Sequence, residues 1–585
     1  MADFEAIVKS EQNKLGRVLE SAQMYIDRDY LAYLSAGDTV AVPQGQSDFS
    51  QIRIIHLKKL VYNTEDIHNQ ILSVFHTLSG ISQTCFLLIC GDGSETNIYL
   101  GIYAPGGSTM AENALKFSID GNFPGTEYVS LNKVECMQVL QTMHGQNNTN
   151  NTSVVSVSQI PSMRGSIDGL NNFTQGIERF IDSMKGEKYT AIIVANPLSS
   201  ADAVSQRNSL ENIYSSLSSL GRLSYQYSEN QSVSEQRSLT TSVTDSITES
   251  ITAGYSYGTM QNSGTTKGGS PNIHAQFSKL GLGYGLQRGS FQSSGTQQGF
   301  QQQQGSARQK GVQTGQGVTQ GEINGQSSSL TITQINKSVE DLLERVDCQI
   351  KRIIEGETYG LWECCAYFAA PTLDIALVAA NVYKALSCGS NTGNTMSHMN
   401  SWDSQRPQDV SCILSSLANA RMPVFKLMSG HLCNAGLMIS GNELPMIMNF
   451  PRKSVCGVSV VKMASFGRDV YYSSQMRMGT RAVRIGKVQH MGRVENTPVK
   501  LDIDNLTSHA LITGTTGVGK STLMAMLLSA LYKAGVKMLV VEPVKGEYKE
   551  LLGAIPGIEV FTVNPYKNRM LRINPVKGSD TYPRK

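Results

Sequence analysis

The sequence of 585 residues predicts an α/β protein, and three observations support this fold class. Short apolar runs alternate with longer amphipathic runs from about residue 50 to 225, as in strands that alternate with helices. A long segment rich in Ser, Gly and Gln interrupts this pattern, and regular structure resumes after it. Near residue 510, an apolar run, a glycine-rich loop and a helical run follow one another. Because a single core stops growing at about 250–300 residues, we expect several folded units.

The predicted organisation has five consecutive parts. The simplest architecture is one α/β domain interrupted by a long insertion, and two separate domains around a linker are the alternative. The five parts are an N-terminal α/β region at 1–227, a Ser/Gly/Gln-rich flexible insertion at 228–330, a continuation of the α/β region at 331–440, a small β-rich module at 441–505 and a last, incomplete part at 506–585.

The N-terminal region has apolar runs that predict strands and longer amphipathic runs that predict helices. Two of the strands are joined by a turn at Gly91-Asp92-Gly93, because Gly-Asp-Gly sequences favour tight turns. The expected strands are Thr84–Cys90, Asn97–Tyr103, Thr152–Ile160 and Tyr189–Ala195, and the expected helices are Glu65–Leu78, Gly176–Met184 and Ser200–Leu220.

The insertion at 228–330 has too few apolar residues to offset the entropy of an ordered chain, so we expect it to be flexible. Its role would be that of a tether or a self-association segment. One part differs, because Leu239, Val243, Ile247 and Ile251 recur at every fourth residue and could form a short amphipathic helix.

Regular structure resumes near Leu330. The apolar positions of Ser338–Ile354 recur with helical spacing, and the run around Trp362 is apolar throughout, which places this tryptophan in a core strand. The expected elements are a helix at Ser338–Ile354, a strand at Gly360–Ala370, a helix at Leu373–Leu386, and then strands at Val455–Met463, Val483–Gln489 and Val499–Ile503.

Charge and cysteine usage restrict the compartment and the partners. The net charge is only +3, but residues 481–585 contain sixteen Lys and Arg against eight Asp and Glu. This local excess suits a polyanion, and the phosphates of a nucleotide would explain part of it equally well. The ten cysteines are scattered without a C-x-x-C pair, and neither a signal peptide nor an apolar run of about 20 residues is present. We therefore expect a cytoplasmic protein without a membrane span.

The strongest motif is Gly514–Ser521, which fits the pattern G-x-x-x-x-G-K-[ST] of a P-loop. It lies between an expected strand at Ala510–Thr513 and a helix that opens at Thr522, as the motif requires. Lys520 would reach the β- and γ-phosphates of ATP, and the Ser521 hydroxyl would bind Mg²⁺. The residues expected to surround the phosphates are Thr515, Thr516, Gly517, Val518, Gly519, Lys520, Ser521 and Thr522.

The run Lys537–Pro543 predicts a buried strand that ends in the acid Glu542. Two interpretations exist: the metal-side acid of a Walker B motif, or an acid at the end of the neighbouring parallel strand. The spacing favours the second, because this is the first strand after the P-loop helix. Only 65 residues follow Lys520, so we expect an N-terminal fragment of a longer protein, with an incomplete RecA-like P-loop sheet and without the acid that hydrolysis needs.

The segment Val541–Tyr548 resembles the D-P-H-G-E-Y segment of HerA-like helicase/translocase ATPases, within the HerA/FtsK superfamily. His509–Thr522 is similar to the strand and P-loop of that family, and Val560–Val563 and Leu571–Pro575 are similar to its next strands. Glu542 and Lys545 stand where the helicases have Asp and His. This difference favours a branch of uncharacterised bacterial ATPases with a Ser-rich insertion, which Gly360–Phe368 and Asn449–Gly467 also resemble.

The resemblance implies an ATP-driven motor, a homo-hexameric ring and DNA as cargo. It also implies that Glu547 faces the nucleotide or a neighbouring subunit, which makes it a candidate catalytic residue beside Lys520. Two alternatives stay open. One is a secretion or conjugation ATPase that moves protein or nucleoprotein, and the other is a nucleotide-gated scaffold whose N-terminal region binds a protein partner.

Overall fold

The computed structural model describes most of the chain outside the insertion. The described residues are 19–41, 49–63, 67–81, 83–105, 108–142, 152–161, 176–220, 222–227, 330–335, 337–387, 397–427, 430–471, 482–503, 506, 509–543, 546–552, 555–563 and 569–571. The predicted helix around Leu239 and the predicted flexibility of the insertion therefore lie outside the described residues. The chain divides into two compact units, Met1–Lys462 and Met463–Lys585.

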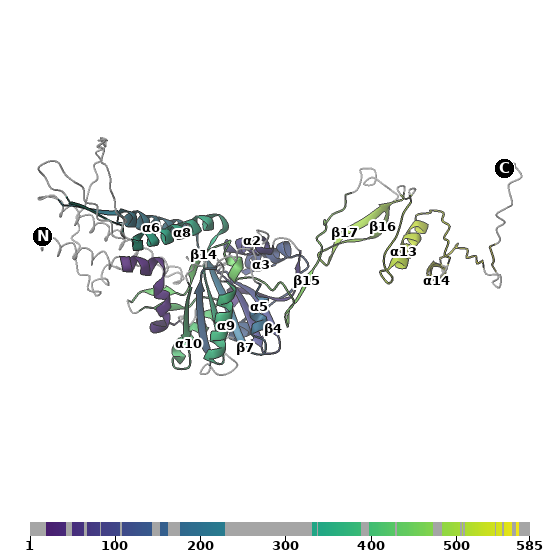
Figure 1. The fold of residues 1–585 in the computed structure, drawn as a ribbon. Helices are drawn as coiled ribbons and strands as arrows, with labels where there is room; N and C mark the ends of the chain where they lie inside the picture. The colour runs from purple at the N-terminus through teal and green to yellow at the C-terminus, as the bar shows by residue number, and fades with distance from the viewer. Residues whose placement is uncertain are drawn as a thin grey trace, which may run out of the picture. The chain divides into compact units, whose positions relative to one another are not determined.

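The first unit contains a ten-stranded sheet, and this confirms the α/β class (Figure 1). Strands from both sides of the insertion lie next to one another in it, in the order β11-β6-β10-β7-β3-β4-β2-β15, with β14 on β10 and β5 on β2. The strands are β2 (Ile52–Tyr62), β3 (Thr84–Asp92), β4 (Thr96–Tyr103), β5 (Glu127–Ser130), β6 (Ser153–Gln159), β7 (Lys188–Pro197), β10 (Leu361–Ala370), β11 (Ser397–Trp402), β14 (Leu437–Ser440) and β15 (Ser459–Lys462).

Pairing in this sheet is antiparallel except at one edge, where β15 runs parallel to β2. Every residue of β10 is buried, because β10 lies between β6 and β7 and is covered on both faces. The predicted strands and the turn after Gly91 are confirmed, and Gly93 has a φ of 97° that favours glycine. A separate small sheet joins β1 (Asp38–Val40), β12 (Val424–Lys426) and β13 (Leu432–Asn434).

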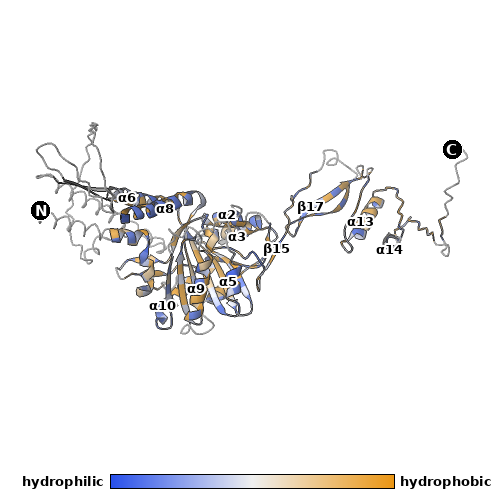
Figure 2. Ribbon diagram, in the orientation of Figure 1, coloured by the Kyte–Doolittle hydropathy of each residue, from blue (hydrophilic) through white to orange (hydrophobic). Residues whose placement is uncertain are grey.

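Helices cover the sheet through aromatic contacts. Trp362 and Phe368 are even-numbered positions of the regular strand β10, so they face the same side. Trp362 meets Phe75 of α2 at 6.2 Å, and Phe368 meets Phe180 of α5 at 5.7 Å and Tyr383 of α9 at 5.2 Å between ring centroids. These helices are α2 (Ile67–Ser79), α5 (Glu178–Ser183) and α9 (Leu373–Leu386); the unit also contains α3 (Ser108–Asn122), α4 (Lys133–Gln141), α10 (Pro407–Ala418), α11 (Leu444–Ile447) and the 3-10 turns η1 (Asp29–Ala36) and η2 (Phe49–Gln51). Figure 2 shows the apolar strands gathered beneath them.

Two long helices carry the ends of the insertion. α6 (Ser200–Leu220) and α8 (Lys337–Tyr359) lie side by side (Figure 1) and bury a second apolar cluster that is separate from the core of the sheet. Helical residues 19–26 add Ala22 and Ile26 to this cluster. Beyond the helices, β8 (Arg222–Tyr227) and β9 (Leu330–Ile335) form a two-stranded ribbon whose last pair is Tyr227 with Leu330.

The N-terminal arm, residues 26–35, is held by side chains that bind its backbone carbonyls. Asn400 Nδ2 donates to Leu31 O at 2.6 Å, and His398 Nε2 donates to Asp27 O at 3.3 Å. Gln349 and Arg406 donate in the same way to the carbonyl groups of Ile26 and Ser35. The arm therefore connects α8, through Gln349, with the β11 edge of the sheet.

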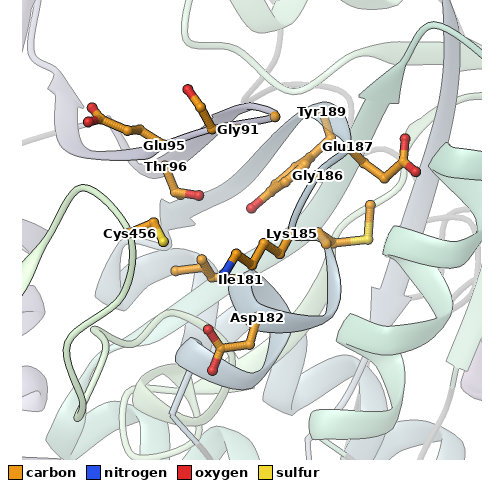
Figure 3. A pocket seen from close by; sticks show the side chains of 13 residues that line it. Gly91, Glu95, Thr96, Ile181, Asp182, Lys185, Gly186, Glu187, Tyr189 and Cys456 are labelled. Atoms are coloured by element: carbon orange, nitrogen blue, oxygen red, sulfur yellow. The ribbon is translucent and has the colours of Figure 1, made fainter.

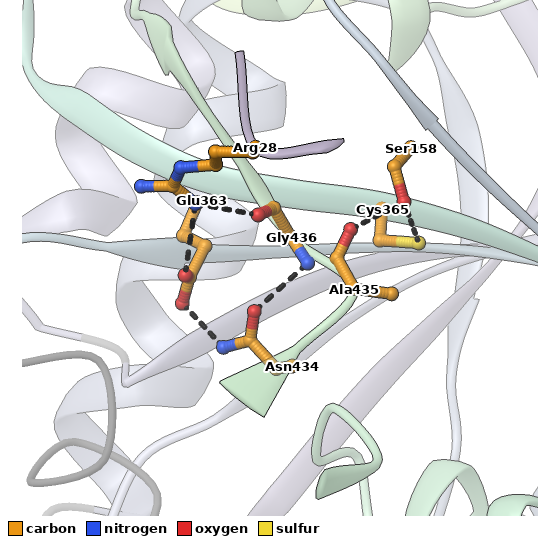
Figure 4. A network of polar contacts seen from close by, with 7 residues as sticks. All are labelled: Arg28, Ser158, Glu363, Cys365, Asn434, Ala435 and Gly436. Atoms are coloured by element: carbon orange, nitrogen blue, oxygen red, sulfur yellow. Dashed lines mark hydrogen bonds and ion pairs between the residues drawn. The ribbon is translucent and has the colours of Figure 1, made fainter. Parts of the chain in front are cut away.

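A polar network is buried beside this arm (Figure 4). Arg28 donates to the carbonyl of Gly436 at 2.9 Å and lies 4.0 Å from a carboxylate oxygen of Glu363. Asn434 Nδ2 donates to the other carboxylate oxygen of Glu363 at 2.7 Å, and its Oδ1 accepts the N–H of Gly436 at 2.8 Å. Burial raises the pKa of Glu363, while Arg28 and Asn434 oppose this rise. The network thus satisfies a buried carboxylate near the start of the central strand β10.

The described residues of the second unit form a β-hairpin and two helices. β16 (Ala482–His490) and β17 (Arg493–Asp502) pair with each other, and α13 (Lys520–Lys533) packs against β16. α14 (Glu547–Leu552) follows and packs against α13. The predicted strand at Val483–Gln489 is confirmed as β16, and β17 begins six residues before the predicted Val499.

Candidate nucleotide-binding site

The loop Gly514–Gly519 leads directly into α13, which begins at Lys520. Gly517 and Gly519 have φ values of 86° and 88°, a backbone region that L-residues rarely adopt. An added Cβ at either glycine would meet no atom within 4 Å, so the loop is open to solvent above them. At Gly514 an added Cβ would lie 2.8 Å from Val518, because the loop folds back tightly on itself.

The residues of the P-loop pattern lie together at the start of α13. Thr515, Thr516, Gly517, Val518 and Gly519 are all exposed, and Thr522 is exposed in the first helical turn. Lys520 and Ser521 are half-buried, and the Lys520 amine donates to the carbonyl of Thr515 across the loop. The first helical hydrogen bond runs from Leu523 N to Gly519 O at 2.9 Å. The N–H groups before Leu523 therefore have no acceptor within the helix.

These features fit the phosphates of ATP. Free N–H groups at a helix N-terminus attract anions, and the helix dipole adds positive potential there. The glycines leave room for close approach of phosphate oxygens, and the Lys520 ammonium supplies a positive charge at the same loop. The half-buried Ser521 hydroxyl is the oxygen donor at this position that could hold Mg²⁺ beside the phosphates.

The strands expected on either side of α13 are not confirmed. No strand is assigned within the described residues 509–519 or 536–543, although both runs are apolar. Leu511 and Leu539 are each 88% exposed, and Val541 is 78% exposed. A strand forms only where a neighbour accepts its hydrogen bonds, and these runs are not paired with another described segment. Near the expected later strands, Thr562 forms a single parallel bridge with Met570.

Glu542 and Glu547 both lie at the start of α14. The carboxylate of Glu542 accepts the N–H of Glu547 at 2.8 Å and the N–H of Tyr548 at 3.0 Å. Glu542 therefore satisfies two N–H groups of the first turn of α14. Glu547 is half-buried in that turn, and α14 packs against α13. This capping role was missed from the sequence, because the contact depends on the path of the chain between Glu542 and α14.

The first unit has a shallow hollow on its surface (Figure 3). Its floor contains Tyr189 and Thr96, which are 4% and 6% exposed. The Tyr189 ring lies across Gly91, where an added Cβ would be 2.4 Å from a ring carbon. Burial raises the pKa of the Tyr189 hydroxyl to about 12, so it stays protonated at neutral pH. The rim contains Lys185, the exposed Cys456 and three carboxylates, those of Glu95, Asp182 and Glu187. Because both signs of charge are present, the rim favours neither an anion nor a cation as ligand.

Across the described ranges, no group of three or more His, Cys, Asp and Glu residues is arranged to hold a metal ion. None of the described helices is both long and apolar enough to cross a membrane. The described cysteines are all free thiols.

Comparison with known protein families gives a match that lies within the second unit. Residues 483–580 match the family described as "Helicase HerA, central domain". No curated protein matches the chain. No solved structure matches it either. The matched segment begins in β16 and includes the whole loop Gly514–Ser521, so it supports a P-loop ATPase of the HerA/FtsK kind.

Proposed function

We propose that this protein is an ATP-driven motor of the HerA/FtsK type that assembles as a hexameric ring and moves DNA. The observation that carries the proposal is the loop Gly514–Ser521, which opens α13 inside the segment that matches the HerA family. DNA as the cargo is supported by the excess of basic residues over 481–585.

In the proposed site, the backbone from Thr515 to Gly519 and the first turn of α13 bind the phosphates. Lys520 neutralises the β- and γ-phosphates, Ser521 binds Mg²⁺, and Thr522 contributes from the first turn. Bound Mg²⁺ would offset the negative charge of the phosphates. Glu547 is proposed to face the nucleotide or a neighbouring subunit, with Glu542 holding its backbone in place. The strands of a RecA-like sheet around this loop remain part of the proposal.

Nucleotide binding is tested by titrating the chain with Mg-ATP and comparing Lys520→Ala with Lys533→Ala. Lys533 is exposed in the last turn of the same helix, so it is a matched control for the loss of one lysine. A charged hydrogen bond contributes about 1.5–3 kcal/mol, so Lys520→Ala should weaken binding by roughly 10- to 100-fold or more. Unchanged affinity in Lys520→Ala would contradict the assignment of the loop.

Hydrolysis by the natural protein at its full length, measured with and without duplex DNA, separates the classes of function. Stimulation by duplex DNA supports a translocase. A hydrolysis rate that DNA does not change supports a motor that moves protein. Binding of ATP without hydrolysis supports a nucleotide-gated scaffold. Sedimentation of the chain with Mg-ATP tests the hexamer.

A further inference from the structure

The β16–β17 hairpin has a regular turn and an irregular ladder. Met491 and Gly492 form the turn with φ values of 48° and 83°, which is the pattern of a two-residue type I′ turn. The ladder shifts register between Arg484 and Gly486 and again between Lys487 and Gln489.

The first register shift places basic residues on one face. Arg484 pairs with Lys500, and Gly486 pairs with Val499, so Ile485 is an extra residue in β16. Without this bulge, residues three apart in a strand would point to opposite faces. With it, Lys487 pairs with Pro498, which lies two residues from Lys500 and on the same face. Arg484, Lys487 and Lys500 therefore share one face of the hairpin, which we call the basic face.

A hydrogen bond links Lys487 to the other strand. Its Nζ donates to Asn496 Oδ1 at 3.3 Å, beside the second register shift. The opposite face is apolar, because Val483 is 5% exposed and pairs with Leu501. The hairpin thus has one packed face and one exposed basic face.

The charges on the basic face oppose one another. Arg484 and Lys500 are exposed and stand directly opposite in the ladder, an arrangement that destabilises a sheet. Asp502 pairs with Ala482 at the end of the hairpin, lies on this face and offsets part of the charge. Between this end and the second register shift, the face therefore carries three basic residues and one carboxylate, a net positive charge that a polyanion would neutralise.

We infer that the basic face of the β16–β17 hairpin binds the sugar–phosphate backbone of DNA. Arg and Lys are the principal donors to phosphates, and such contacts position a protein without reading sequence. Same-face residues of a strand repeat every 6.8 Å or so, about twice the 3.4 Å axial spacing of phosphates along one DNA strand. The inference names the DNA-contacting surface of the proposed motor, and it rests on DNA being the cargo.

The test uses the whole chain and a fluorescent duplex of about 25 base pairs, without nucleotide, over a range of salt concentrations. Arg484→Glu places opposite charges across the ladder, so the hairpin should be at least as stable as before. Its affinity for the duplex should fall by about tenfold or more at 0.1 M salt, and the slope of log K against log salt should fall by about 1. Lys188→Glu, at an exposed lysine of the first unit, makes the same change of charge and should leave both quantities unchanged.

A second variant covers the case in which Arg484→Glu perturbs the fold. Lys487→Gln does not alter the Arg484–Lys500 pair and should lower the salt slope by about 0.9. Unchanged affinity and slope in both variants would overturn the inference. It would also be overturned if the chain bound poly-glutamate with the same affinity as the duplex. If the unaltered chain binds Mg-ATP but not duplex DNA, the inference fails and the nucleotide site stands. If DNA binding depends on Arg484 while Mg-ATP does not bind, the inference stands and the proposed nucleotide site fails.

Discussion

Glu542 has a role at the start of α14 that its place at the end of an apolar run does not indicate. Its carboxylate accepts two backbone N–H groups, from Glu547 and Tyr548. A helix of six residues makes few hydrogen bonds of its own, so its first turn depends strongly on such acceptors. The candidate residue Glu547 is therefore positioned through Glu542.

Replacing Glu542 with Ala should destabilise the first turn of α14. Loss of a side-chain cap costs about 1 kcal/mol, and the amide protons of Glu547 and Tyr548 should then exchange roughly fivefold faster. Hydrogen exchange read by NMR or mass spectrometry measures this. Glu550→Ala removes the same charge from an exposed position of the same helix and is the control. Equal exchange in both variants would show that Glu542 does not cap α14.

Individual core residues could be predicted well, whereas their partners could not. Trp362 was expected in a core strand, and it is fully buried. Its apolar neighbours in sequence indicate burial, but nothing local indicates that Phe75 of α2 lies beside it. Likewise, the P-loop pattern identifies Lys520 because the motif is local, while the contact of Glu542 with α14 depends on the path of the intervening chain.

At the scale of elements, helix bounds follow from local signals. α9 begins and ends as predicted, because Thr372 caps its first turn and its apolar positions recur with helical spacing. Strand neighbours follow from contacts between distant segments, so the parallel pairing of β15 with β2 was not predictable. The early start of β17 at Arg493 also escaped prediction, because its first residues are polar and only the turn at Met491 and Gly492 reveals the hairpin.

Replacing the insertion with a short turn should leave the first unit folded. β8 and β9 pair up to Tyr227 and Leu330, so a two-residue Asn-Gly turn can join these ends in place of residues 228–329. Shortening this connection from about 100 residues to two lowers the entropic cost of closing it, which should stabilise the fold by about 3 kcal/mol. Denaturant unfolding followed by circular dichroism measures this. A large loss of stability would mean that the insertion contributes to the core.

For the whole molecule, the division into two compact units predicts two unfolding events. Differential scanning calorimetry should show a larger transition for Met1–Lys462 and a smaller one for Met463–Lys585. Mg-ATP at 100 times its Kd should stabilise only the smaller one, by about 2.7 kcal/mol, because the loop Gly514–Ser521 belongs to that unit. Lys520→Ala should remove this shift. A single transition, or an equal shift of both, would contradict independent units.

The way in which the N-terminal arm is held has a consequence for sequence divergence. Asn400, His398, Gln349 and Arg406 bind its backbone carbonyls, and every residue type supplies a carbonyl. Apart from Arg28, Asp27, which pairs with Arg345, and the residues that pack in the core, side chains of the arm can therefore change while its path stays the same. The four side chains that hold the arm lie more than 300 positions away from it in the sequence. Among homologues we therefore expect the sequence of the arm to vary and these four distant residues to be conserved.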